Sequence, residues 1–330
     1  MAVVCADALS FQADVLALKH AQGLFGVDAA VADVLFGGAE AGTIRKALPK
    51  LGHHKIVASA KKLGVEKVLY VGVKPLFEFD YQGIREFARL VLEILSQEVP
   101  HARHVALTLH GAGYGLDVTE AFESEVAGLL DAVNSKEFPN SLERISIVER
   151  DPERADRLAE ILRAILPTGL IGGGKGGAMR EVEEGSRERL RSVGYASASK
   201  PYIFVAMPFA DEFNDTFHYG ISGAVNAAGF LCERADLSAF TGDVMDWVTK
   251  RIAGAVLVVA DLSTANPNVY LEVGYAWGLG KPTVLLVRDT VDLKFDVKSQ
   301  RCLVYNKSFK SLETLLRKEL EELKPRIATP

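Results

Sequence analysis

The sequence predicts an α/β protein made of two α/β domains, of which the second has a parallel sheet. Segments rich in Val, Ile and Leu alternate with amphipathic helical segments along most of the chain. This alternation is typical of mostly parallel sheets with helices packed on their faces. The 330 residues exceed an ordinary single domain, and a stretch rich in Gly, Ser and charge interrupts the alternation after the middle of the chain.

The first domain is predicted over residues 1–166. Its apolar segments predict strands at 13–20, 67–73, 104–113 and 143–150. Helices are predicted at 43–52, 81–98, 118–135 and 151–166. In the second of these helices Ile84, Phe87 and Val91 fall on one face, which indicates packing against a sheet.

Residues 167–200 are rich in Gly, Ser and charge with weak helical periodicity, so they are predicted to be a linker with a short helix around 179–192. The second domain follows over 201–330. Its predicted strands are 201–209, 229–236, 254–263, 282–289 and 302–306. Its predicted helices are 211–227, 243–253, 266–280 and 308–324. This order predicts a flavodoxin-like or Rossmann-like sheet of about five strands.

Composition narrows the classes of function. The net charge of −5 gives no basic face for nucleic acid, so no nucleic-acid partner is expected. Cys5, Cys232 and Cys302 lie far apart without a CxxC motif, so neither a disulfide framework nor a metal site is predicted. The first residues lack a signal-peptide pattern, and no apolar run approaches the ~18 residues of a membrane span. We therefore expect a cytoplasmic protein without a membrane partner.

One acidic residue lies in an otherwise apolar and aromatic helix, within "NPNVYLEVGYAWGLGKP" (266–282). Asn266 is a predicted helix cap, and Pro267 suits the first helical position. Asn268 and Glu272 are four residues apart and so share one helix face. A carboxylate framed by amides and aromatics suits a reaction in which positive charge develops on a sugar ring. The alternative is a buried ion pair of Glu272 with Arg234 or Arg288.

Further residues are expected near this helix, because ligands bind beyond the carboxyl ends of parallel strands. Met207 and Phe209 follow the first strand of the second domain, and Asp261 ends the third. The predicted substrate-binding residues are Met207, Phe209, Asp261, Asn266, Asn268 and Tyr275. For Asp261 the alternative is a side chain that caps the turn after its strand.

Three segments of the second domain together resemble a known superfamily. They are "YIFVAMPFADEF", "LCERADLSAFTGDVMDWVTKRIAGAVLVVADLS" and the Glu272 helix, within about 201–310. They resemble the nucleoside 2-deoxyribosyltransferase superfamily, especially its branch that merges with bacterial TIR-like domains. The resemblance implies that Glu272 is the nucleophile and that Asp246, or alternatively Asp243, assists the leaving base. Ordinary charges at a helix N-terminus would also explain these two aspartates.

The resemblance has consequences for the substrate. Asn266 stands at or near the position of the superfamily's sugar-binding carboxylate, a departure that disfavours strict deoxyribose transfer. TIR-like relatives cleave the nicotinamide–ribose bond of NAD with an equivalent Glu. NAD is therefore an expected substrate, and no separate cofactor is predicted.

A glycine-rich turn, "HGAGYG" (110–115), joins a strand to a helix in the first domain. Backbone N–H groups in such a turn, at a helix N-terminus, can bind phosphate. Gly111, Gly113 and Gly115 are predicted to bind a signal, with Tyr114 covering its sugar or base; tight packing is the alternative for the glycines. Together with "ADVLALKHAQG" and "KKLGVEKVLYVGVKP", the turn resembles macro-like domains, particularly the N-terminal domain of leucine aminopeptidases. The resemblance implies a ligand related to ADP-ribose.

The combined prediction is a prokaryotic immune effector. A nucleotide-derived signal would bind the macro-like domain, and the TIR-like domain would cleave the N-glycosidic bond of NAD or a related nucleotide. A homo-oligomer is expected, since TIR-like effectors complete their sites by assembly. One alternative is a nucleoside or nucleotide 2-deoxyribosyltransferase or N-glycosidase of nucleotide metabolism. The other is a non-catalytic module that binds a nucleotide and signals by oligomerising.

Overall fold

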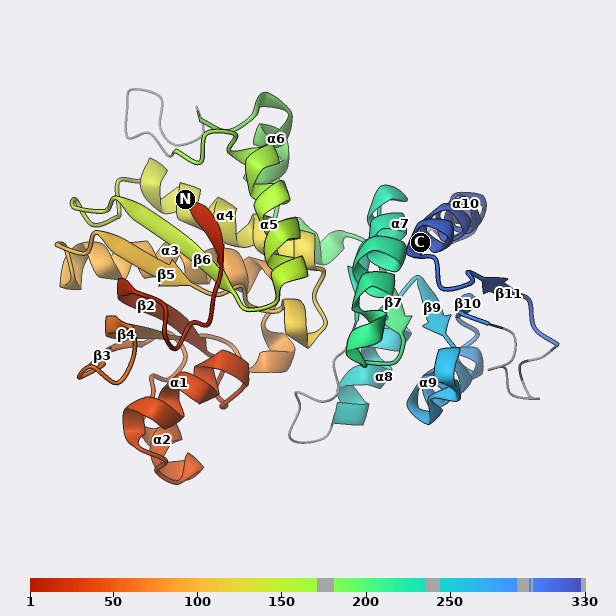
Figure 1. Ribbon diagram of the computed structural model, residues 1–330, viewed down its shortest axis with the longest axis horizontal. Helices are drawn as coiled ribbons and strands as arrows, with labels where there is room; N and C mark the ends of the chain where they lie inside the picture. Colours follow the sequence, from red (N-terminus) through yellow and green to blue (C-terminus); the bar gives the residue numbers. More distant parts are fainter. Residues whose placement is uncertain (171–180, 235–243, 290–296, 298, 328–330) are drawn as a thin grey trace. The chain divides into compact units, whose positions relative to one another are not determined.

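The computed structural model describes residues 1–170, 181–234, 244–289, 297 and 299–327. Within it the chain forms two compact units. The first contains Met1–Ala112 and Val118–Ala198, and the second contains Gly113–Asp117 and Ser199–Pro330. The ribbon in Figure 1 shows a sheet with its own helices in each unit. The prediction of two α/β domains is confirmed.

The first unit is built on a six-stranded sheet of order β1-β6-β5-β2-β4-β3. All neighbouring strands are parallel except β3 and β4, which pair antiparallel at one edge. The strands are β1 (Ala2–Cys5), β2 (Ala13–His20), β3 (His54–Ala58), β4 (Val65–Gly72), β5 (His104–Leu107) and β6 (Arg144–Glu149). Central strand β2 is almost wholly buried, which explains its continuous run of apolar residues.

Helices cover this sheet and bury its apolar side chains. Residues of α1 (Gly26–Phe36) and α2 (Ala41–Ala47) share a hydrophobic cluster with β2 and β4. The long helices α3 (Tyr81–Glu98) and α4 (Val118–Asn134) pack against each other, and α5 (Pro152–Ile165) packs on β1 and β6. Asp80 caps α3 and Asp151 caps α5, each by accepting a backbone N–H in the first turn.

The described part of the predicted linker is anchored to the first unit. Helix α6 (Glu184–Ser192) lies within it. The guanidinium of Arg85 on α3 donates to the carbonyls of Leu190 (2.9 Å), Arg191 (3.3 Å) and Val193 (2.5 Å). The same group pairs with Asp131 of α4 through two hydrogen bonds. One buried arginine therefore holds this segment against α3 and α4.

The second unit has a five-stranded sheet of order β11-β10-β9-β7-β8, in which every pair is parallel. The strands are β7 (Tyr202–Ala206), β8 (Leu231–Glu233), β9 (Leu257–Asp261), β10 (Thr283–Val287) and β11 (Cys302–Val304). Counted within the unit, the order is 2-1-3-4-5, which is the flavodoxin-like order. The prediction of a flavodoxin-like parallel sheet is therefore confirmed.

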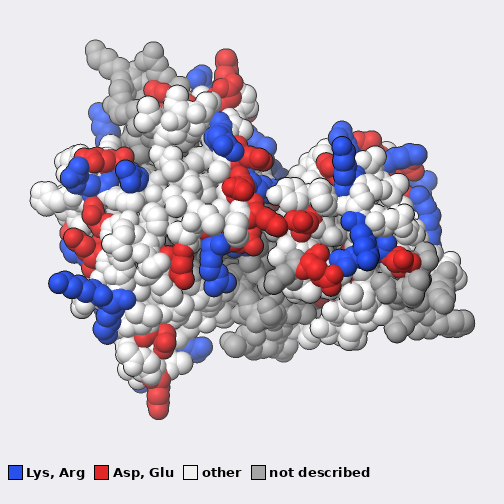
Figure 2. All heavy atoms as spheres, in the orientation of Figure 1, with Lys and Arg blue, Asp and Glu red and all other residues white. Residues whose placement is uncertain are grey.

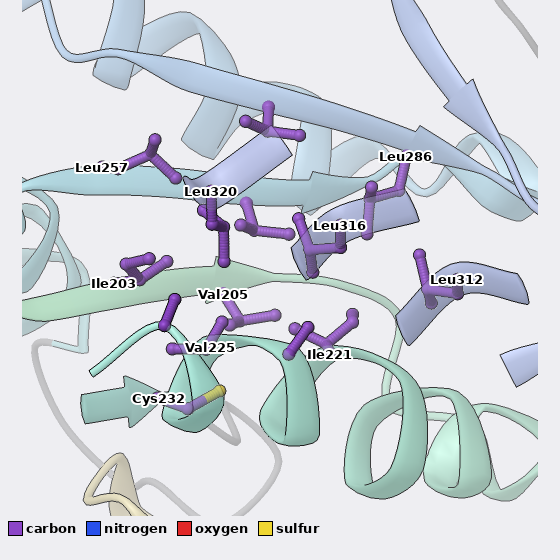
Figure 3. Close-up of a cluster of buried hydrophobic side chains, with 14 of the residues drawn as sticks. Ile203, Val205, Ile221, Val225, Cys232, Leu257, Leu286, Leu312, Leu316 and Leu320 are labelled. Carbon is purple, nitrogen blue, oxygen red and sulfur yellow. The ribbon is translucent and has the colours of Figure 1, made fainter. Parts of the chain in front are cut away.

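Helices cover both faces of the second sheet. Leu312, Leu316 and Leu320 of α10 (Phe309–Ile327) pack with Ile221 and with Val225 of α7 (Ser222–Ala227) on one face (Figure 3). On the other face, α8 (Val244–Gly254) and α9 (Pro267–Gly278) share a separate cluster with β7 and β9.

The structure also contains elements that the sequence patterns did not predict. Strands β1 and β3 were missed because they are short and half-exposed, and helix α1 because its apolar residues are not confined to one face. The predicted helix 211–227 consists of a 3-10 turn (Asp211–Phe213), a π-helical segment (Thr216–Ile221) and α7. No helix in the described residues is long and apolar enough to cross a membrane.

Candidate functional site

The carboxyl ends of the strands of the second unit meet at one edge of its parallel sheet, and α9 begins at that edge. The side chain of Asn266 accepts the backbone N–H of Asn268 at 2.9 Å, and Pro267 occupies the first turn. These residues are therefore the cap and start that the sequence predicted. Because its oxygen caps the helix, Asn266 serves a local structural role.

Glu272 lies in the second turn of α9 and is only 7% exposed. Its neighbours on the buried face of the helix, Val269, Val273 and Ala276, are core residues. Burial raises the pKa of Glu272 to about 7. Near neutral pH the carboxyl group is therefore protonated in some molecules and ionised in others.

The ion-pair alternative for Glu272 finds no support in the described residues, none of which forms a salt bridge with it. Arg288 pairs with Glu212 at 2.6 Å, and its guanidinium lies over the ring of Phe213. The guanidinium of Arg234 lies 4.3 Å from the ring centre of Phe209. A buried carboxyl without an opposing charge is costly unless a ligand uses it.

The predicted substrate-binding residues do not all gather around this carboxyl. Met207 is buried in the cluster on the α10 face of the sheet, whereas α9 packs on the opposite face. Phe209 is half-buried beneath Arg234. Tyr275 and Asn268 are exposed side chains of α9 itself.

Of the two aspartates predicted to assist the leaving base, the structure describes Asp246. Asp246, in the first turn of α8, is exposed and binds Lys250 one turn later at 2.6 Å. This is the arrangement of an ordinary surface helix pair. Asp243 lies outside the described residues.

Asp261 is fully buried at the end of β9. Its carboxylate accepts the hydroxyl of Tyr305 at 2.8 Å and the backbone N–H of Ser263 at 3.0 Å. Burial raises its pKa, and these hydrogen bonds oppose the rise. The bond to Ser263 is the turn-capping contact that the sequence left as the alternative.

The sheet of the first unit has a topological switch point between the carboxyl ends of β2 and β5. From β2 the chain continues to β3 and β4 on one side, and from β5 it continues to β6 on the other. Ligands of open α/β sheets bind where the connections diverge in this way. Lys19 and Asp28 form a buried ion pair beside it, with a 2.6 Å contact.

Several buried polar groups of the first unit have no hydrogen-bond partner among the described residues. They are His20 Nδ1, Asp28 Oδ1, Thr108 Oγ1, His110 Nε2 and both carboxylate oxygens of Glu125. Burial raises the pKa of Glu125 to about 8, although the nearby backbone N–H of His110 opposes the rise. Burial and the charge of Lys19 lower the pKa of His110 well below its ordinary value. Such groups call for a water or a polar ligand.

Sequence reasoning missed most of this cluster. Lys19 and His20 end a predicted strand, but Asp28 and Glu125 carry no motif. Their signal in the sequence is a charge on a helix face that is otherwise apolar. Within the described residues, no group of three or more His, Cys, Asp and Glu is arranged to hold a metal.

The predicted signal-binding turn is divided between the units. Gly111 belongs with the first unit, whereas Gly113, Tyr114 and Gly115 belong with the second. Gly111 and Gly115 have φ values of 86° and 104°, which other residues rarely adopt. The backbone conformation therefore explains two of the glycines without a ligand.

Comparisons with known proteins concern about half of the chain. No protein-family model matches, and neither does any curated protein. Among solved structures, the Oceanobacillus iheyensis macrodomain with MES bound is 17% identical, with a TM-score of 0.39, over 49% of this chain and 89% of that one. A point mutant of that macrodomain with ADPR is 17% identical, with a TM-score of 0.40, over 50% and 93%.

A third solved structure is the Trypanosoma brucei macrodomain in complex with ADP. It is 15% identical, with a TM-score of 0.38, and the match covers 48% of this chain and 67% of that one. At such identities and TM-scores the likeness carries nothing about the ligand or activity of this chain. The function of this chain is therefore inferred from the geometry of the two sites alone.

Proposed function

We propose that the second unit cleaves the N-glycosidic bond of NAD or a related nucleotide, with the Glu272 carboxylate facing the sugar. The observation that carries the proposal is a buried carboxyl at the ligand-binding edge of a flavodoxin-like sheet, without an ion pair in the described residues. A carboxylate in such surroundings interacts strongly with a positive charge, because little water screens it.

The chemistry requires Glu272 in its ionised form. As the bond between the anomeric carbon and the base nitrogen breaks, its electron pair leaves with the base and positive charge develops on the ribose. The carboxylate then stabilises that charge or attacks the anomeric carbon, and water completes the hydrolysis. With a pKa of about 7, roughly half of the groups are ionised at neutral pH, and the approaching cation favours that form.

The placement of Asp246 agrees with NAD as the substrate. The nicotinamide nitrogen of NAD is positively charged, so nicotinamide leaves as a neutral molecule without gaining a proton. Release of adenine or another neutral base is assisted by a proton donor. Asp246 lies on the surface, bound to Lys250, and this position does not suit it to donate a proton beside a buried Glu272.

The first unit is proposed to bind the signal, a nucleotide-derived ligand related to ADP-ribose. Support comes from the topological switch point between β2 and β5 and from the buried polar groups of His20, Thr108 and His110, which have no hydrogen-bond partner among the described residues. Acidic and basic side chains are interspersed over the visible face of each unit (Figure 2). A role as a prokaryotic immune effector would follow if that signal controlled NAD cleavage.

The decisive experiment follows nicotinamide release by chromatography, with purified protein and NAD, in the presence and absence of ADP-ribose. We expect release by the native chain and a loss of at least about 1,000-fold in Glu272→Gln, which keeps the shape but not the charge. Asp246→Asn is the matched control and should stay within about threefold of the native rate. Unchanged activity in Glu272→Gln would refute the site.

The alternatives give different products in the same experiment. Base exchange on deoxynucleosides without an activator would indicate a 2-deoxyribosyltransferase, and ligand binding without any product would indicate a signalling module. The homo-oligomer stays a prediction, supported by Leu271 and Trp277, apolar side chains that α9 exposes. A specific activity that rises with protein concentration would indicate a site completed by assembly.

A further inference from the structure

The turn between β9 and α9 is held by a compact buried group of hydrogen bonds. Asp261 accepts Tyr305 Oη through Oδ2 at 2.8 Å and the Ser263 N–H through Oδ1 at 3.0 Å. Ser263 Oγ in turn accepts the backbone N–H of Arg288 at 2.8 Å and lies 3.4 Å from the Tyr305 hydroxyl. Asp261, Ser263 and Tyr305 are each at most 1% exposed.

This group spans three strands of the sheet. Tyr305 follows β11, Arg288 follows β10 and Asp261 ends β9. The backbone N–H of Tyr305 also binds the carbonyl of Val287, at 3.1 Å. The phenol therefore reaches from the edge strand, past β10, to the start of the turn that leads into α9.

The turn itself has a conformation that needs support. Thr264 and Ala265 have φ values of 62° and 49°, in the left-handed region that side chains other than glycine disfavour. Such strain persists only where the surroundings hold the backbone in place. The next residue, Asn266, caps α9, so the turn sets where the helix starts.

The consequence reaches Glu272, which lies in the second turn of α9. A change at the start of a helix shifts or rotates the side chains of its first turns as one body. Glu272 is buried mainly by the face that it shares with Val269 and Val273, so a small rotation of α9 would expose it.

We propose that Asp261 and Tyr305 are positioning residues. They hold the turn 263–265 in its strained form and thereby set how deeply the side chain of Glu272 is buried. This assigns to Asp261 a task other than the substrate contact expected from the sequence. Both of its carboxylate oxygens already accept a hydrogen bond, and none of its surface is exposed. Only the catalytic consequence rests on the proposed function; the effect on α9 does not.

The test replaces the hydroxyl alone, as Tyr305→Phe in the full chain. The carboxyl of Glu272 is titrated by NMR in protein carrying ¹³C-labelled glutamate, and its signal is assigned by its loss in Glu272→Gln. We expect the pKa of Glu272 to fall by about 0.5–1 unit towards its ordinary value, because a displaced α9 exposes the group. Amide exchange at Asn268 should accelerate at least about threefold.

Two further variants make the result decisive. Tyr219→Phe alters an exposed tyrosine beside Phe309, on the face of the sheet opposite α9, and should leave the Glu272 titration unchanged. Ser263→Ala removes the acceptor of the Arg288 N–H but keeps the Asp261 carboxyl, and should shift the titration in the same direction as Tyr305→Phe. If Tyr305→Phe does not fold, the titration of Glu272 in Ser263→Ala tests the positioning role instead.

The outcomes separate positioning from stability and from the proposed function. If Tyr305→Phe lowers the melting temperature but leaves the Glu272 pKa and α9 exchange at native values, the positioning role is wrong. If the native chain releases nicotinamide, the variant should show a kcat at least about tenfold lower with a nearly unchanged KM. A shifted titration in a chain that cleaves nothing would retain the positioning role and refute the proposed function alone.

Discussion

At the scale of the residue, burial decides the charge state of several carboxyl groups. Glu125 is fully buried in α4, and its pKa rises to about 8, while that of Glu272 rises to about 7. Asp28 is also buried, but Lys19 opposes the rise of its pKa. The same side-chain chemistry thus gives a neutral acid at one position and an ion pair at another.

Replacing Glu125 by Gln should change how stability depends on pH. The folded pKa of about 8 lies above the ordinary 4.5, so the folded state holds the proton more tightly. The stability contributed by the protonated group is present below about pH 4.5 and is lost as the pH rises to about 8. Relative to the native chain, Glu125→Gln should therefore gain about 4 kcal/mol in free energy of unfolding between pH 5 and pH 8.5.

Urea unfolding at these two pH values measures the gain. Glu86→Gln, at an exposed position of α3, is the control and should show a nearly constant difference from the native chain. A constant difference for Glu125→Gln as well would mean that Glu125 is ionised in the folded state.

At the scale of the element, individual side chains fix how segments attach to the sheets. Arg85 joins α3 to α4 through Asp131 and to the end of α6 through three carbonyls, and its guanidinium also lies over the ring of Tyr195. Glu120 and Glu123 of α4 add contacts to Ser197 and Arg189. The composition of this segment is that of a linker. Its attachment depends on partners far away in the sequence, so the composition does not reveal it.

Arg85→Lys tests this attachment. Lysine keeps the charge but lacks the planar fork that binds Asp131 and the carbonyls together. We expect a loss of about 1–3 kcal/mol in the free energy of unfolding and faster proteolysis within 182–198. Arg89→Lys, a half-exposed neighbour paired with Glu93, should change neither by a comparable amount. Equal proteolysis of the native chain and both variants would contradict the anchoring role.

At the scale of the whole molecule, the chain has two sheets with separate hydrophobic cores. Phe122 lies in the first unit and Leu316 in the second, and both are fully buried. Units with separate cores can unfold in separate steps. The division between them is not a simple cut, because Gly113–Asp117 belongs with the second unit although the sequence around it belongs with the first.

Calorimetry of two core variants tests this independence. Phe122→Ala and Leu316→Ala should each destabilise their own unit by about 2–5 kcal/mol. We expect unfolding of the native chain in more than one transition, with each variant lowering a different one. A single transition that both variants shift equally would show that the units unfold cooperatively.

The sequence by itself determined the features that depend on local pattern. Helix α3 occupies the predicted residues 81–98, and the cap at Asn266 begins α9, because periodicity, capping and proline act over a few residues. The alternation of strands and helices likewise predicted two α/β units and the flavodoxin-like sheet. It also placed Glu272 on a largely apolar helix, before any contact was known.

Only the tertiary structure decided which partners these residues have. It placed Met207 on the face of the sheet opposite α9, bound Asp261 to Tyr305 and left Glu272 buried without a salt bridge in the described residues. It also brought the buried His110 close to Lys19 and Glu125. The physical reason is that hydrogen bonds and burial join residues far apart in the chain, and no local pattern encodes those distances.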